Sequence, residues 1–96
     1  MASISREAIR LLEEALAAFR LEPYEQLVRR IDAGPVCAER IGPSSARYQL
    51  EFSFVWDDRP GGNLRVLGSI DDGRWRAFVP LTRDFIKAAD GSFIGE

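Results

Sequence analysis

The chain has 96 residues, of which 46% are hydrophobic and 29% are charged, and its formal net charge is −2. This length fits a single domain, residues 1–96, and the apolar content is enough to build a buried core. The slightly acidic balance argues against nucleic-acid binding, which normally leaves a basic footprint on a protein.

Nothing in the sequence predicts export or membrane insertion. The N-terminal stretch MASISREAIRLLEEALAAF has no basic region followed by a long apolar segment. The longest apolar run, residues 15–19, is far shorter than the roughly 20 residues that span a bilayer. Cys37 is the single cysteine, so no internal disulfide can form. We therefore expect a soluble, cytoplasmic protein without a membrane partner.

Two amphipathic helices are predicted first. Ser3 or Ser5 is placed to cap the first helix. Its apolar stripe follows helical spacing at Ile9, Leu12, Leu16 and Phe19. The second helix begins at Pro23 and ends at Gly34. The residues between the two helices are then a bend.

Four strands are predicted after the helices, over residues 36–41, 47–57, 63–70 and 74–81. The second strand has the clearest alternation, with apolar side chains at Tyr48, Leu50, Phe52, Phe54 and Trp56. Each helix has one apolar face that must pack on something, and the sheet supplies it. The predicted fold is α+β, with two N-terminal helices packed on one face of a four-stranded antiparallel meander.

The stretch IDDGRW, which starts at Ile70, is interpreted as the turn between the last two strands. A two-residue turn at Asp72-Gly73 sets Ile70 opposite Trp75 and makes every pair on that face apolar or small. A three-residue loop would set Ile70 opposite Arg74 and bury charge. The two-residue turn is therefore the prediction.

The same parity argument predicts the connection between the second and third strands. Their apolar side chains share a face if the loop covers residues 57–63 and Phe52 lies opposite Gly68. The absence of a side chain at Gly68 would let a helix approach the sheet closely, with Phe52 filling the gap.

The tail FIKAADGSFIGE contains a second Asp-Gly, which predicts a short C-terminal hairpin or turn. In the hairpin, Ala88 pairs with Phe93. The alternative is a helical turn over residues 83–87 capped by Thr82.

The sheet face that turns away from the helices mixes charges with the apolar side chains of Val55, Leu67 and Phe78. Proteins rarely leave such a patch open, so a cover is expected. We favour the C-terminal segment as that cover. The alternative is a symmetric dimer through this face or the sheet edge, in which the arginines at the rim pair with Glu51 of the other chain.

The chemistry that an enzyme needs is largely missing. The chain has no histidine, the commonest general base near neutral pH. Cys37 lies on a predicted strand and is interpreted as a small hydrophobe. The pairs Asp57-Asp58 and Asp71-Asp72 lie at opposite ends of the third strand and cannot share an ion. We expect no catalytic residue, no cofactor and no metal.

Residues 65–96 carry the pattern I-D-D-G-x-W-R-A-F, then P-L-T, then F-I-x-A-x-D-G-S-F-x-G-E. In this sequence pattern the chain resembles a family of short, mostly bacterial proteins of unknown function. The resemblance implies family membership and no particular activity, because that family has no established catalytic residues. The order of helices and strands is also similar to that of small bacterial immunity or accessory proteins, a likeness of fold alone.

Two functions are therefore considered. The first is a non-catalytic interaction module, accessory or immunity-like, whose partner is another protein or a second copy. Its candidate surface consists of Leu67, Phe78, Val55, Arg65, Arg74, Arg76, Asp57, Asp58 and Arg59. The second is a small-ligand-binding domain with a pocket between the second helix and the sheet. Its candidate lining is Tyr24, Tyr48, Trp56 and Arg40.

Overall fold

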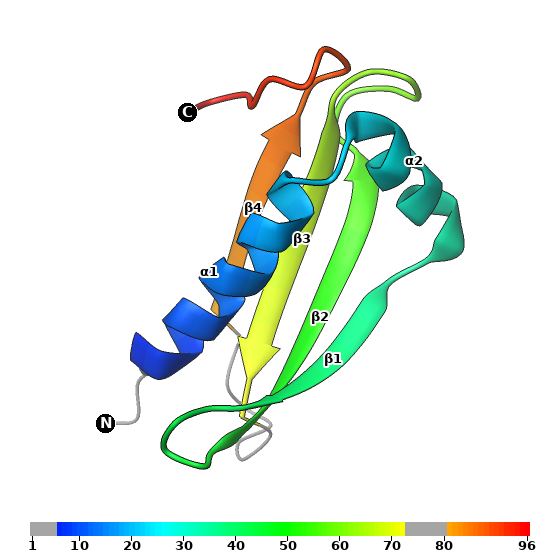
Figure 1. The fold of residues 1–96 in the computed structure, drawn as a ribbon. Helices are drawn as coiled ribbons and strands as arrows, with labels where there is room; N and C mark the ends of the chain where they lie inside the picture. Colours follow the sequence, from blue (N-terminus) through cyan, green and yellow to red (C-terminus); the bar gives the residue numbers. More distant parts are fainter. Residues whose placement is uncertain (1–5, 73–80) are drawn as a thin grey trace.

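The computed structural model describes residues 6–72 and 81–96 of the chain. Its elements, in chain order, are α1 (Arg6–Arg20), α2 (Tyr24–Ala33), β1 (Val36–Ile41), β2 (Arg47–Trp56), β3 (Leu64–Asp71) and β4 (Leu81–Lys87). The strands form one antiparallel sheet in the order β1-β2-β3-β4, and both helices lie on the same face of it (Figure 1). The predicted α+β fold is confirmed.

Each helix covers a different part of the sheet. Helix α1 packs on β3 and β4, whereas α2 packs on β2. Pro23 precedes α2 as its N-cap instead of opening it, and Gly34 ends the helix with φ of +95°, a conformation that glycine adopts without a steric cost. Ile9 belongs to the predicted apolar stripe but is only half-buried, because α1 turns Ala8 and Leu12 toward the sheet.

The core lies between the helices and the inward-facing side chains of the strands. Its buried members are Ala8, Leu12, Leu16, Leu27, Tyr48, Leu50, Phe52, Phe54, Leu64, Val66, Ile70 and Phe85. Phe19 of α1 joins them through its ring, which lies 4.9 Å from that of Phe52 and 5.3 Å from that of Phe54. The helices and the sheet therefore share one core.

The predicted connection between β2 and β3 is confirmed. Phe52 pairs with Gly68, and the loop runs from residue 57 to residue 63. A Cβ built on Gly68 would lie 2.9 Å from Phe52 Cε1 and 3.0 Å from Leu12 Cδ1. The missing side chain is what allows α1 to approach the sheet at this point.

The predicted register between β3 and β4 is wrong. Ile70 pairs with Leu81 instead of Trp75, and Leu64 pairs with Lys87. Strand β4 as described begins at Leu81, where the predicted strand ended. The predicted turn glycine and the predicted fourth strand before Leu81, with Arg74, Arg76 and Phe78, lie outside the described residues.

The register between β3 and β4 differs from the prediction because β4 does not follow a simple apolar alternation. Its helix-side face carries Arg83 and Lys87 beside Leu81 and Phe85. The edge position leaves Arg83 exposed, and the amine of Lys87 reaches two main-chain carbonyls. The observed register thus places two cations on a face that the apolar pattern reserves for uncharged side chains. The alternative of a helical turn over residues 83–87 is also wrong, because these residues are in β4.

The C-terminal tail turns back along the outer edge of β4. Lys87 pairs with Phe93, one residue away from the predicted pair of Ala88 and Phe93. The N–H of Ala88 donates to the carbonyl of Ser92 at 2.8 Å. Residues 89–91 lie between these two, so the turn is longer than two residues. The carboxylate of Asp90 stabilises it by accepting hydrogen bonds from the N–H and Oγ of Ser92 at 2.9 and 2.6 Å.

Candidate interaction surface

The face of the sheet opposite the helices, called the open face here, carries a group of apolar side chains. Val55, Arg65 and Ile86 lie opposite one another on β2, β3 and β4 and so share this face. Ile94 continues the row, because its N–H donates to the carbonyl of Ile86 at 2.9 Å. Leu67 lies two residues beyond Arg65 on β3. We call the four apolar side chains Val55, Leu67, Ile86 and Ile94 the open-face patch.

The open-face patch is accessible to solvent. Val55 is 42% exposed, Leu67 36% and Ile94 42%, while Ile86 is half-buried. The prediction that the C-terminal segment covers Val55 and Leu67 is therefore wrong. The tail instead enlarges the apolar surface by adding Ile94 to it.

Arg65 lies within the open-face patch and is paired inside the chain. Its guanidinium donates to Asp57 at 2.7 and 3.0 Å and also to Asp84. These hydrogen bonds raise the pKa of Arg65 above its ordinary value, and the hydrogen bond to Asp57 has the largest effect. The guanidinium is thus already engaged by two carboxylates, whereas a dimer contact with Glu51 of another chain would need it free.

Carboxylates outnumber arginines on the open face among residues 6–72 and 81–96. The described strands and the first loop residue, Asp57, contribute two arginines and five carboxylates to this face: Arg47, Arg65, Glu39, Glu51, Asp57, Asp71 and Asp84. Glu39 accepts long hydrogen bonds from Arg47 at 3.4 Å and from Gln49 at 3.3 Å. Within the described residues, the open face therefore combines an apolar patch with more carboxylates than arginines.

The loop over residues 57–63 is held in place by its own side chains. Asp58 accepts hydrogen bonds from the N–H groups of Arg59 at 2.7 Å and of Asn63 at 2.8 Å, which lower its pKa. The hydroxyl of Tyr24 donates to the carbonyl of Gly62 at 2.7 Å and so ties the loop to α2. Of the predicted surface residues in this loop, Arg59 extends into solvent, whereas Asp58 shapes the loop.

The four residues of the alternative pocket do not come together. Tyr24 and Trp56 lie near the 57–63 loop, whereas Tyr48 pairs with Arg40 toward the other end of the sheet. From residue 48 to residue 56 the strand extends about 26 Å at about 3.3 Å per residue. The hydroxyl of Tyr48 is also engaged, since it donates to Glu7 at 2.8 Å. One small ligand cannot contact all four side chains.

Two features were not found from the sequence. The first is Glu7, which accepts hydrogen bonds from the N–H and Oγ of Ser44 at 2.8 and 2.6 Å in addition to the one from Tyr48. These hydrogen bonds, that from the Ser44 hydroxyl foremost, lower the pKa of Glu7. The sequence offered only the signal of an acidic residue in the first turn of a helix, which gives no indication of a partner in the β1–β2 connection.

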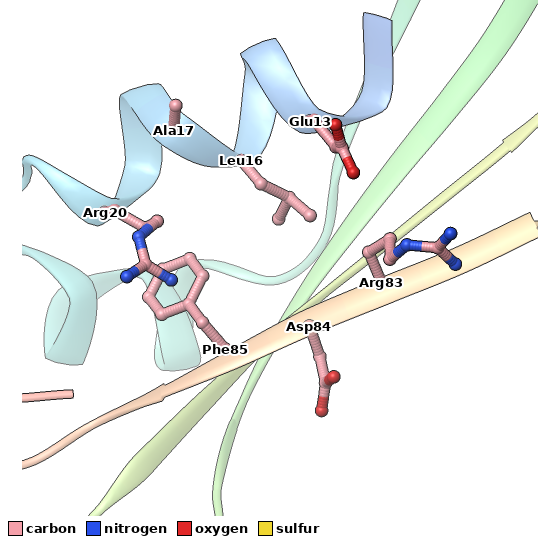
Figure 2. Close-up of a pocket in the computed structure, with 7 residues that line it drawn as sticks. All are labelled: Glu13, Leu16, Ala17, Arg20, Arg83, Asp84 and Phe85. Atoms are coloured by element: carbon pink, nitrogen blue, oxygen red, sulfur yellow. The ribbon is translucent and has the colours of Figure 1, made fainter. Parts of the chain in front are cut away.

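The second feature that was not found from the sequence is an open groove between α1 and β4, with a volume of about 240 Å³ (Figure 2). Its lining residues are Glu13, Leu16, Ala17, Arg20, Arg83, Asp84 and Phe85. No sequence signal could find it, because the groove depends on how α1 crosses the edge of the sheet.

Residues 6–72 and 81–96 contain no group of three or more histidine, cysteine, aspartate or glutamate side chains able to hold a metal ion. In the same parts of the chain, no helix has the length and apolar character needed to cross a bilayer. Comparisons with protein-family models, with curated proteins and with solved structures find no match for the chain.

Proposed function

We propose that the protein is a non-catalytic interaction module of the accessory type, which binds a partner protein through the open face of its sheet. The observation that carries the proposal is the open-face patch, in which apolar side chains surround an arginine already positioned by two carboxylates. Exposed apolar side chains gathered around an ordered arginine are typical of the energetically important part of a protein interface.

Several carboxylates of the chain have a structural role, because they hold turns and helices in place. Glu7 joins α1 to the β1–β2 connection, Asp58 and Asp90 stabilise turns, and Glu96 pairs with Arg20 at 2.5 Å. The chain also contains no histidine. These assignments support a binding role over a catalytic one.

On the described part of the open face carboxylates outnumber arginines, and this supports a partner of matching chemistry. An excess of negative charge attracts a basic protein surface and speeds its encounter. The same excess disfavours a dimer in which two open faces meet, because like charges would be brought together. A basic partner protein is therefore favoured over a second copy, and self-association stays a prediction from the sequence.

The test uses a photo-crosslinking amino acid in place of Leu67 in the full chain, expressed in its host cell. The cross-linked protein is identified, purified and titrated against the wild type. We expect Leu67→Arg to weaken binding at least about tenfold, the loss typical of a central interface residue. We also expect the affinity to fall with added salt, because the attraction is partly electrostatic.

Leu21→Arg is the matched control. Leu21 is also an exposed leucine, 86% accessible, and it lies in the bend between α1 and α2, away from the open face. Equal losses for the two variants, or no cross-link at position 67, would contradict the proposal. A cross-link to a second copy would support the dimer instead.

A further inference from the structure

Within the described part of the chain, the outer edge of β4 is only partly covered. The tail pairs with it at Lys87 and Ile86. Main-chain groups of an edge strand point alternately toward the sheet and away from it, and Ile86 points away. By the same alternation Thr82 and Asp84 direct their N–H and C=O groups outward. No segment of residues 6–72 or 81–96 pairs with this half of the strand.

The uncovered half of β4 lies beside the groove. Leu16 and Ala17 of α1 and Phe85 of β4 supply its apolar surface, and Glu13 and Arg83 flank it (Figure 2). A cavity of about 150 Å³ is large enough to hold benzene. The groove, at about 240 Å³, therefore has room for one large apolar side chain.

The charges around this edge are not balanced on both sides. On the open face, Asp84 belongs to a group in which Arg65 is shared between Asp84 and Asp57, leaving one negative charge in excess. On the helix side, Glu13 and Arg83 carry opposite charges. A strand added here would thus be favoured by a basic side chain next to Asp84.

We propose that β4 accepts an extended segment of a partner protein as an additional antiparallel strand beside residues 82–85. The segment places a bulky apolar side chain in the groove and, at the next position, a basic side chain beside Asp84. Peptide recognition by strand addition works in this way, with main-chain hydrogen bonds giving affinity and pockets for alternate side chains giving specificity. The proposal rests on the proposed function as an interaction module and adds a second surface to it.

Two observations favour such a segment over a second copy of the chain. The tail already pairs with this edge, so β4 accepts a neighbouring strand. The added segment would lie along the same edge, next to the position that Ile94 occupies. In contrast, symmetric antiparallel pairing of two β4 strands through residues 82–85 sets Asp84 or Arg83 opposite its own counterpart. Like charges directly opposite each other destabilise a strand pair.

The probe is the hexapeptide Leu-Lys-Thr-Thr-Val-Ser with blocked ends, titrated into the ¹⁵N-labelled full chain and followed by NMR. We expect saturable shifts at the amides of Thr82 and Asp84 and at Ala17. A peptide with serine in place of leucine should bind at least about tenfold more weakly, because it leaves the groove empty. A peptide with glutamate in place of lysine should bind about two- to fivefold more weakly, as expected for an exposed ion pair.

Ala17→Trp and Ala18→Trp are the matched protein variants. Both alanines are exposed on α1, but only Ala17 lines the groove. We expect Ala17→Trp to fill the groove and to weaken peptide binding at least about tenfold, whereas Ala18→Trp leaves it unchanged. Circular dichroism of both variants checks that the fold is retained.

The proposal is overturned if millimolar peptide causes no shift at Thr82 and Asp84, if the shifts occur on the open-face patch instead, or if the serine peptide binds equally well. Its failure is distinguishable from failure of the proposed function. Leu67→Arg tests the open face and leaves the groove intact, and Ala17→Trp does the reverse.

Discussion

Glu7 shows how one side chain connects distant parts of this fold. It accepts hydrogen bonds from Ser44 and Tyr48, and its pKa is lowered from the ordinary value of 4.5. A carboxylate whose pKa is lower in the folded chain than in the unfolded chain stabilises the fold. Its full contribution is present when the pH is above the pKa of the unfolded chain. That stabilisation is lost as the pH falls through the folded pKa.

Glu7→Gln should therefore reduce the acid sensitivity of the protein. We expect the Tm of the wild type to fall as the pH is lowered from about 7 to about 3, and the variant to show a shallower fall and a lower Tm at neutral pH. Thermal unfolding by circular dichroism across this range is the measurement. Glu14→Gln, at an exposed position of the same helix, should keep the wild-type slope. Parallel curves for all three proteins would contradict the assignment.

Gly68 is the second informative residue, because α1 meets the sheet at this point. Gly68→Ala adds a Cβ that would lie 2.9 Å from Phe52 and 3.0 Å from Leu12, so the core must shift. We expect a loss of about 1–3 kcal/mol in the free energy of unfolding, as for other overpacked cores. Urea denaturation measures it, with Ser69→Ala on the same strand as control. An unchanged midpoint would mean that α1 can move away without cost.

At the scale of elements, β4 is tied to α1 by a buried lysine. Lys87 is 7% exposed, and its amine donates to the carbonyls of Arg20 at 3.0 Å and of Glu22 at 2.8 Å. These carbonyls lie at and just after the end of α1, where a helix lacks internal donors. Nearby, Arg20 stacks on Phe93 at 4.0 Å, so the tail joins the same cluster.

Lys87→Met should destabilise this junction. Methionine retains much of the apolar stem but leaves two carbonyls without their donor, and we expect a cost of about 1–3 kcal/mol. The measurement is urea denaturation followed by circular dichroism. Arg83→Met is the control, because Arg83 is exposed on the same strand and, among the described residues, its guanidinium donates to the neighbouring carbonyl of Thr82. A larger effect for Arg83→Met would show that the cluster at Lys87 contributes little.

Lys87 also explains why one strand pairing could be predicted and the other could not. Side-chain parity located Phe52 opposite Gly68 because every helix-side position of β2 and β3 is apolar or glycine. In β4 the inward positions include Arg83 and Lys87, and the latter is accommodated only by carbonyls of a helix far away in the chain. Local pattern carries no information about such a partner.

At the scale of the whole molecule, the helices and the sheet should unfold together, because they share one core. Leu12 of α1 is fully buried and Leu50 of β2 is 2% exposed. We expect Leu12→Ala and Leu50→Ala each to cost about 2–5 kcal/mol and to shift the helix signal and the tryptophan fluorescence equally. A variant that melts the helices while the fluorescence transition stays in place would contradict a single cooperative unit.

The candidate surface was predictable only in part. Strand alternation places Val55 and Leu67 on the face opposite the helices, and both are exposed there. The addition of Ile94 depends on the tail pairing one residue away from the predicted register. The pairing of Arg65 with Asp84 depends on the register of β4. Both belong to long-range geometry, and so does the groove beside β4.

The sequence by itself determined the α+β class, the two helices, the bounds of β1 and the pairing of β2 with β3. These follow from the periods of apolar side chains, which are local properties of the chain. Only the tertiary structure decided the register of β4, the path of the tail, the partners of Glu7, Arg65 and Lys87, and the groove between α1 and β4. The physical reason is that a charged side chain can occupy an inward or edge position whenever a distant segment supplies its hydrogen bonds. That partner is known only once the chain is folded.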